Sequence, residues 1–222
     1  MDIPAQPLPD PLPQEPFTLA AEWLDQAMKD VVQPNPNSMV LASVDAQGHP
    51  SARVVLCKEL LVGTGGVVFY TNYESRKGRE LDSTGHAAAV FHWDYRHRQV
   101  RIEGNVERLP ASVSDAYFAS RPWQSRLGAW ASRQSQPIGS LAQLRERVRS
   151  TAQHFDIPYE GPGTPEPAEI NVEIPRPLHW GGYVLVACAV ELWVEGPYRI
   201  HERVRWTRTG RDGEWSHERL QP

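Results

Sequence analysis

An arginine and a histidine two residues apart near the C-terminus could bind and orient an anionic ring. Arg199 and His201 lie in the run 197–203, and Arg203 follows two residues later. Because residues two apart in a β-strand face the same way, an extended segment would point all three side chains to one side. A permanent planar cation beside a group that titrates near neutral pH suits proton-coupled chemistry on such a substrate. The alternative is a cationic strand face that contacts only solvent.

The segment 70–78 has the composition of a phosphate-binding turn. It reads YTNYESRKG, which predicts a strand end, then a turn, then a helix that begins at about Ser75. Hydroxyl groups, two cations and the amides of a helix N-terminus would converge there, and such sets bind phosphate monoesters. The sequence contains neither GxxxxGK[ST] nor GxGxxG, so the common nucleotide loops are excluded. A capped, charged surface helix remains the alternative.

A predicted strand at 52–57 carries an arginine in its middle. Alternation places Arg53, Val55 and Cys57 on one face, and Lys58 on the other face at the strand end. An unpaired buried charge is very unfavourable, so Arg53 needs either an anionic ligand or a carboxylate partner. The residues alone leave both possibilities open.

Three residues spaced four apart could form a second, smaller phosphate site. Tyr117, Arg121 and Ser125 would share one face of a continuous helix, although a proline between the last two predicts a helix end there.

The amides of Gln99 and Gln134 both donate and accept hydrogen bonds, so they could contact the edge of a heteroaromatic ring. Glutamines of this kind are more often surface residues.

The composition is that of a globular protein with one sizeable core. The chain has 222 residues, of which 40% are hydrophobic and 23% charged. A net charge of −4 argues against general nucleic-acid binding, whereas the local basic clusters favour a small anionic ligand. No membrane-spanning stretch or signal-peptide pattern is present, so a cytoplasmic location is expected. Cysteine and histidine spacing predicts buried free thiols and no metal site.

The pattern of elements predicts a mainly β fold, an antiparallel barrel with helices packed outside. Residues 1–16 contain six prolines and are expected to form a flexible arm, followed by a single domain over 17–222. Strands are predicted at about 39–44, 52–57, 67–71, 87–93, 99–109, 182–194, 198–207 and 214–219, and helices at about 18–31, 112–120 and 140–155. Residues 156–178, rich in Pro and Gly, are expected to form a surface loop.

From about Ser38 to Pro222 the chain resembles the pyridoxamine/pyridoxine 5′-phosphate oxidase family. Seven motifs carry the resemblance in order: SARVVLCK (51–58), FYTNYESRKG (69–78), RQVRIEG (98–104), YFASRP (117–122), GAWASRQS (128–135), HWGG (179–182) and RIHER (199–203). The resemblance implies an FMN-binding split β-barrel and a homodimer with FMN at the subunit interface. It also implies oxidation of pyridoxamine or pyridoxine 5′-phosphate to pyridoxal 5′-phosphate, with O2 reduced to H2O2.

The resemblance also implies a role for individual residues. FMN would be held by Arg53, Val54, Val55, Leu56, Lys58, Tyr70, Thr71, Arg76, Lys77, Gln99, Gln134, Ser135, Trp193 and Arg203. The substrate would be held by Lys58, Tyr117, Arg121, Ser125, Arg199 and His201, of which Arg199 and His201 are expected to be catalytic.

The N-terminal segment departs from the family pattern. Family members usually carry basic residues and a tyrosine there that close over the substrate, but residues 1–16 contain neither Arg nor Tyr. This difference favours a related FMN oxidase of another substrate, such as a dihydrophenazine acid. The presence of Tyr117, Arg121, Ser125, Arg199 and His201 together argues against that alternative, because a substrate without phosphate has little use for that set. A non-catalytic flavin-binding split barrel would lose the substrate residues, which this chain keeps.

Overall fold

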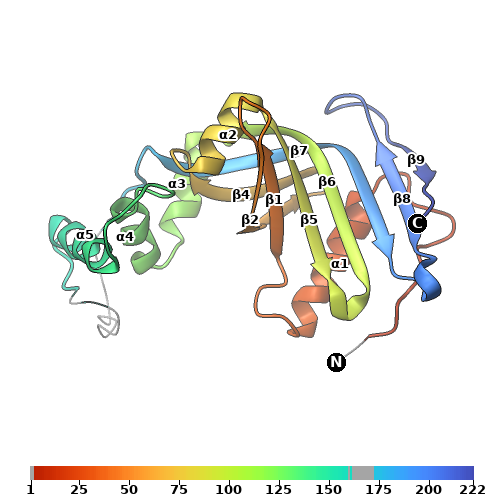
Figure 1. Cartoon of the computed structure of the whole chain (residues 1–222), viewed down its shortest axis with the longest axis horizontal. Coiled ribbons are helices and arrows are strands. Elements are labelled where there is room, and N and C mark those ends of the chain that lie inside the picture. Colours follow the sequence, from red (N-terminus) through yellow and green to blue (C-terminus); the bar gives the residue numbers. More distant parts are fainter. Residues whose placement is uncertain (1–2, 160, 162–172) are drawn as a thin grey trace. The chain divides into compact units, whose positions relative to one another are not determined.

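The computed structural model describes residues 3–159, 161 and 173–222, and its strands join one mainly antiparallel sheet (Figure 1). The strand order is β2-β1-β5-β6-β7-β4-β3, with β8 paired to β7 and β9 to β8. The strands are β1 (Ser38–Val44), β2 (Pro50–Leu56), β3 (Glu59–Leu61), β4 (Gly66–Asn72), β5 (His86–Trp93), β6 (Arg98–Arg108), β7 (Trp180–Val194), β8 (Glu202–Thr207) and β9 (Ser216–Arg219). The helices are α1 (Phe17–Asp30), α2 (Arg76–Thr84), α3 (Ala111–Ala119), α4 (Trp123–Ala131) and α5 (Leu141–His154), with short 3-10 turns η1 (Asp94–Arg96) and η2 (Pro197–Arg199).

The hairpin predicted near the N-terminus is confirmed. Strands β1 and β2 pair antiparallel, with Val40 opposite Val54, and Gly48 in the connection has a φ of +86°. Glycine adopts this left-handed conformation without the steric penalty of a side chain. The alternation of β1 buries Met39 and Leu41 and turns Val40 outward. The hairpin therefore presents one apolar face to the core and a second one outward.

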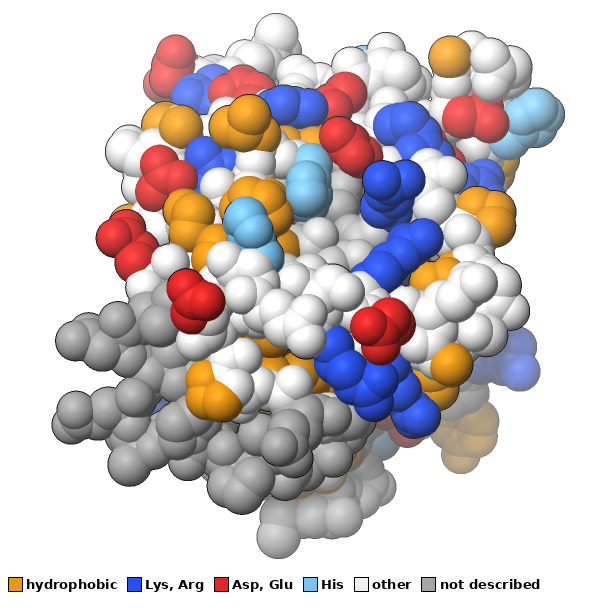
Figure 2. Space-filling view, turned by 90° about the vertical axis from the view of Figure 1, so that its left-hand side faces the viewer, with side chains coloured by type: hydrophobic (Ala, Val, Ile, Leu, Met, Phe, Trp, Pro, Cys, Tyr) orange, Lys and Arg blue, Asp and Glu red, His pale blue; other side chains and the backbone are white. Residues whose placement is uncertain are grey.

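The predicted single domain consists of two compact units. Unit 1 comprises residues 1–69, 80–107 and 183–222, and unit 2 comprises residues 70–79 and 108–182. Unit 1 holds most of the sheet around fully buried aromatic side chains such as Trp93 and Trp206. Unit 2 packs α3, α4 and α5 around Phe118, Leu127 and Trp180. Figure 2 shows one face of the molecule, on which several Lys and Arg side chains lie next to one another.

The proline-rich N-terminal segment is held along unit 1 by specific contacts. Leu8 is only 6% exposed, and its N–H donates to the Glu202 carboxylate at 3.1 Å. Further along the segment, the Pro13 carbonyl accepts from the indole of Trp206 at 3.0 Å. The predicted arm is thus a segment without helix or strand that packs on the sheet, because its few apolar side chains and its carbonyls find partners there.

Other predictions hold in part. The helix α4 was missed because Pro122 reads as a stop, whereas it precedes the first residue of a new helix. The short strand β3 was also not among the predicted strands.

The prediction of two buried free thiols holds for Cys57 only. Burial raises the pKa of the Cys57 thiol to about 12, whereas Cys188 is exposed, so the prediction is wrong for Cys188. Within the predicted loop 156–178, residues 160 and 162–172 lie outside the described part.

None of the helices in the described part of the chain is long and apolar enough to cross a membrane. Nor do the side chains described there bring together three His, Cys, Asp or Glu residues suited to a metal ion.

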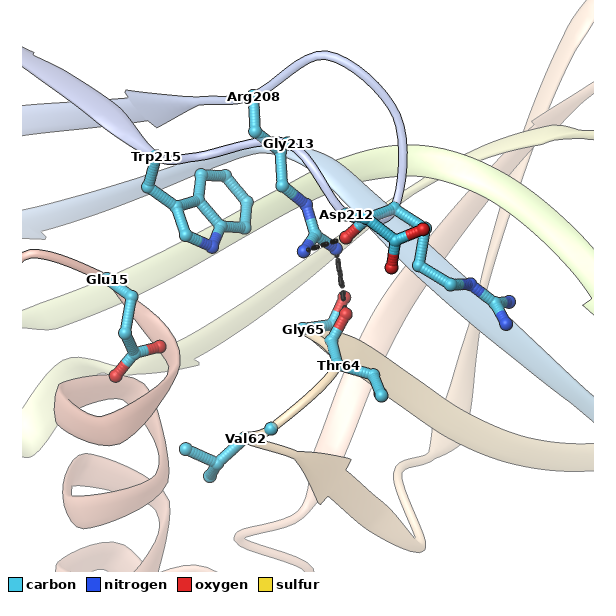
Figure 3. Close-up of a pocket in the computed structure, with 10 residues that line it drawn as sticks. Glu15, Val62, Thr64, Gly65, Arg208, Asp212, Gly213 and Trp215 are labelled. Atoms are coloured by element: carbon cyan, nitrogen blue, oxygen red, sulfur yellow. Dashed lines mark hydrogen bonds between the residues drawn. The ribbon is translucent and has the colours of Figure 1, made fainter.

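A pocket of about 320 Å³ in unit 1 is organised by Arg208 (Figure 3). The guanidinium stacks on Trp215 at 4.5 Å and donates to the carbonyls of Thr64 (2.8 Å) and Gly65 (3.2 Å). It also donates to the carbonyls of Ala187 (2.8 Å) and Arg211 (2.7 Å). Because every nitrogen of the guanidinium already donates to a backbone carbonyl, Arg208 ties the loop before β4 to β7 and to the β8–β9 connection.

Replacing Arg208 with alanine is expected to destabilise the protein by about 2–4 kcal/mol, because it removes several charged hydrogen bonds. For a chain of this length that corresponds to a fall in melting temperature of roughly 4–16 °C, measurable by thermal unfolding. Arg211→Ala is the matched control, since the exposed pair of Arg211 with Glu107 (2.7 Å) should contribute little. Equal melting temperatures for the two variants would contradict this role of Arg208.

Candidate functional site

In unit 2, three of the predicted FMN residues meet at the N-terminus of α2. The Lys77 ammonium donates to the Thr71 hydroxyl at 3.2 Å and to the Gln134 amide oxygen at 3.0 Å, and Thr71 also donates to Gln134 at 3.2 Å. Arg76 is the first residue of α2 and is exposed. Ser135, beside Gln134, is exposed in a turn. The helix N-terminus, a lysine and two hydroxyl or amide groups thus form a site suited to a phosphate.

The first turn of α2 is held tightly to the strand end before it. Ser75 donates its hydroxyl to the Asn72 carbonyl at 2.7 Å and accepts from the Gly78 N–H at 3.2 Å. A Cβ on Gly78 would lie 2.1 Å from the Tyr73 carbonyl oxygen. Only glycine permits this approach, so it places the amides of the helix end at a fixed position.

Stacked aromatic rings beside an arginine form the second part of the site in unit 2. Tyr70 stacks on Tyr117 with a centroid separation of 3.9 Å and on Trp180 at 5.4 Å. The Arg121 guanidinium lies 4.6 Å from the centroid of Trp180. Its buried Nη1 has no hydrogen-bond partner among the described residues. Burial lowers the pKa of Arg121 below its usual value, and a bound anion would oppose that shift.

The predicted triplet with a spacing of four lies across a helix break. Tyr117 is in α3, Arg121 follows that helix, and Ser125 is in the first turn of α4, half-buried. The helix end predicted at Pro122 is confirmed, so the three side chains do not share one face of a continuous helix. The break instead places Arg121 beside the N-terminus of α4, where backbone amides and the dipole favour an anion.

In unit 1, Arg53 belongs to an ion-pair network rather than standing alone. It pairs with the buried Glu80 at 3.1 Å and donates to the Ser43 hydroxyl at 2.5 Å; Ser51 completes the network. The carboxylate partner considered from the sequence is thus present. Arg53 is half-buried, and so is Val55.

The other residues of this segment are exposed. Val54 is 66% exposed and Leu56 38%, and both lie on the outward face of β2. Lys58 follows the strand and lines a pocket of about 400 Å³ with Cys57, beside Leu24 of α1.

A third set of predicted residues lies around the C-terminal strands of unit 1. The ring of Trp193 is 4.7 Å from that of His201, and Trp193 pairs with Arg203 across β7 and β8. Arg203 forms an ion pair with the buried Glu191 at 2.8 Å, and this partner raises the pKa of the guanidinium. Gln99 is half-buried on β6, opposite His92.

The strand predicted from residue 198 begins only at Glu202. Pro197–Arg199 forms a 3-10 turn instead, in which Tyr198 and Arg199 have φ values of 56° and 66°. The predicted row of Arg199, His201 and Arg203 on one strand face is therefore wrong. Arg199 is exposed on the turn, whereas His201 turns back to the backbone of Gly196.

Two buried carboxylates were missed by the sequence reasoning. Glu80 holds Arg53, and Glu191 holds Arg203 and lies 3.1 Å from Arg101. Glu191 had a detectable signal, because it is a carboxylate inside the apolar run 184–194. Such a residue must be paired when buried.

Comparisons with known proteins agree on the family. The family described as pyridoxamine 5′-phosphate oxidase matches residues 24–155, and the pyridoxine 5′-phosphate oxidase C-terminal dimerisation region matches residues 180–222. Among the similar proteins, a pyridoxine/pyridoxamine 5′-phosphate oxidase of Paraburkholderia phytofirmans is 47% identical over 94% of this chain and 90% of its own. One of Bordetella petrii is 46% identical over 97% of this chain and 93% of its own.

Two solved structures share the fold. PhzG from Burkholderia lata, crystallised with tetrahydrophenazine-1-carboxylic acid, has a TM-score of 0.81 and 30% identity, covering 96% of this chain and 95% of its own. An FMN-binding protein of Nostoc punctiforme has a TM-score of 0.68 and 17% identity, covering 94% and 98%. The chain therefore belongs to the pyridoxamine 5′-phosphate oxidase family and has its split β-barrel fold.

Proposed function

We propose that this protein is an FMN-dependent oxidase that converts pyridoxamine and pyridoxine 5′-phosphate to pyridoxal 5′-phosphate, with O2 as acceptor and H2O2 as product. The observation that carries the proposal is Arg121, half-buried against Trp180 with a buried Nη1 that has no partner in the described chain. A partly buried guanidinium with a free hydrogen-bond donor can bind a phosphate, and the neighbouring aromatic rings can contact the ring of an aromatic phosphate ester. Relatives with this activity in their names support the same substrate class.

The residues present fit a flavin mononucleotide. The contacts of Lys77, Thr71 and Gln134 at the N-terminus of α2 match a terminal phosphate. We assign FMN to these residues together with the remaining set implied by the motifs: Arg53, Val54, Val55, Leu56, Lys58, Tyr70, Arg76, Gln99, Ser135, Trp193 and Arg203. When bound, this group would accept the hydride equivalent from the substrate and pass electrons to O2.

A homodimer with FMN at the subunit interface is part of the proposal. The outward face of β1 and β2 exposes Val40 (42%), Val54 (66%) and Leu56 (38%) side by side, since Val40 pairs with Val54 in register. Contiguous exposed apolar surface of this kind marks a protein interface. The match to a C-terminal dimerisation region supports a second copy of this chain as the occupant.

The chain's own residues supply binding and orientation. The substrate phosphate would be bound by Arg121, Lys58, Tyr117 and Ser125. Arg121 would contribute most to this binding, because its charge is partly desolvated. Arg199 and His201 would contact the pyridine ring and hold the reacting carbon in one orientation.

A second candidate is oxidation of a dihydrophenazine acid. It is favoured by the 30% identity to PhzG over nearly the whole chain and by the lack of Arg and Tyr in residues 1–16.

An oxygen-consumption assay of the FMN-loaded protein separates the candidates, with pyridoxamine 5′-phosphate, pyridoxine 5′-phosphate and a dihydrophenazine acid as substrates. Turnover of the two phosphate esters is expected; turnover of the phenazine substrate alone would replace the proposal. A protein that stays colourless after FMN addition would contradict the cofactor assignment.

A further inference from the structure

The turn that joins β7 to β8 is built around Gly196. The Gly196 N–H donates to Nδ1 of His201 at 3.2 Å. A Cβ on Gly196 would lie 1.8 Å from the Ile200 carbonyl oxygen, so no other residue fits this turn. Two successive residues, Tyr198 and Arg199, adopt left-handed φ values that non-glycine residues rarely occupy. The turn therefore has one defined, strained conformation, and the hydrogen bond from Gly196 to His201 joins its two ends.

This contact determines which nitrogen of the imidazole carries the proton. A backbone N–H can only donate, so Nδ1 of His201 must accept, and a neutral ring then has its hydrogen on Nε2. The ring of Trp193, 4.7 Å away and inclined by 43°, restricts the imidazole from another side. The side chain thus offers one hydrogen-bond donor in a fixed direction.

The two carboxylates nearest in sequence are bound elsewhere. Glu195 pairs with Nδ1 of His97, and the Glu202 carboxylate accepts the Leu8 N–H at 3.1 Å. The only hydrogen bond of the His201 ring among the described residues is the one at Nδ1, so the Nε2–H is available for another acceptor.

We propose that Gly196 is a positioning residue, which sets His201 in the Nε2–H tautomer so that it donates to an anionic oxygen of the bound substrate. This inference rests on the proposed function for the identity of the acceptor, but the tautomer itself does not depend on it. An imidazole that is already oriented loses less rotational freedom when the substrate binds than a mobile imidazole does. The turn would therefore raise the affinity for the substrate.

Nitrogen-15 NMR of histidine-labelled, FMN-loaded protein without substrate tests the tautomer, with a His201→Gln sample to assign the signals. At a pH where the ring is neutral, Nδ1 of His201 is expected to show the shift of an unprotonated nitrogen and Nε2 that of an N–H. The reverse pattern, or an averaged one, would overturn the proposal even if the protein oxidises its substrate as expected.

Two substitutions test the donor. The amide of glutamine reaches the position of Nε2, whereas that of asparagine reaches only the position of Nδ1. His201→Gln is therefore expected to keep kcat/KM within about tenfold, and His201→Asn to lose about 10- to 100-fold, mainly through KM, as one hydrogen bond to a charged group predicts. An asparagine variant as active as the glutamine variant would refute the donor role.

Gly196→Ala tests the positioning role directly. We expect it to raise KM by about tenfold and to abolish the single-tautomer pattern of His201, since the added Cβ forces the turn to move. Gly63→Ala is the matched control, because a Cβ there meets nothing within 4 Å. A Gly196→Ala protein that folds with an unchanged tautomer would contradict the proposal.

Discussion

Replacing Arg121 by glutamine is expected to lower kcat/KM for pyridoxamine 5′-phosphate by about 10- to 100-fold. A hydrogen bond to a charged group contributes roughly 1.5–3 kcal/mol, and 1.4 kcal/mol corresponds to a factor of ten. The Arg121 guanidinium is partly desolvated against Trp180 and Phe118, with centroid distances of 4.6 and 5.4 Å, so its charge is little screened by water. The loss should therefore lie at the upper end of this range.

The decisive measurement is whether the loss of activity is confined to substrates that carry a phosphate. Pyridoxamine without phosphate should be oxidised as slowly by Arg121→Gln as by the unchanged protein, because neither can make the contact. Arg149→Gln serves as the control in the same unit, since Arg149 pairs with Glu146 at 3.1 Å on the exposed surface of α5. If the variant lost activity equally toward both substrates, Arg121 would support the fold rather than bind the phosphate.

Local patterns predicted most of the elements in this fold. The hairpin of β1 and β2 follows from alternation and from Gly48, and α1 follows from an apolar stripe with a helical period. The turn Pro197–Arg199 could not be predicted, because neither tyrosine nor arginine favours the left-handed conformation found there. The close approach of Gly196 to the Ile200 carbonyl in the same turn is visible only in three dimensions.

Residue types and family motifs name the candidate site residues, but they do not name the carboxylates that pair with the arginines among them. Motifs identify Arg53 and Arg203 as cations, whereas their partners, Glu80 and Glu191, come from other segments of the chain. Such pairs depend on strand register and side-chain direction, which no spacing rule contains. The structure therefore supplies the carboxylate partner that the sequence left open for Arg53, and it gives Arg203 a buried carboxylate partner as well.

Glu191→Gln is expected to destabilise the protein by about 3–5 kcal/mol and to weaken FMN binding. Glu191 is 3% exposed and pairs with Arg203 at 2.8 Å and with Arg101 at 3.1 Å. Removing one partner of a buried ion pair leaves the other charges uncompensated, which is strongly unfavourable. Thermal unfolding of the FMN-free protein should show a melting temperature lower by roughly 6–20 °C.

A flavin fluorescence titration measures the expected weakening of FMN binding, because Arg203, which we propose holds FMN, loses the carboxylate that fixes its position. Glu103→Gln is the matched control: its carboxylate contacts Arg101 at 3.0 Å and Arg205 at 3.4 Å, but its side chain is 37% exposed. Water compensates charge at such a position, so the control should change stability by less than about 1 kcal/mol. Equal losses in the two variants would mean that the whole arginine–glutamate cluster, rather than burial of Glu191, determines the stability of this region.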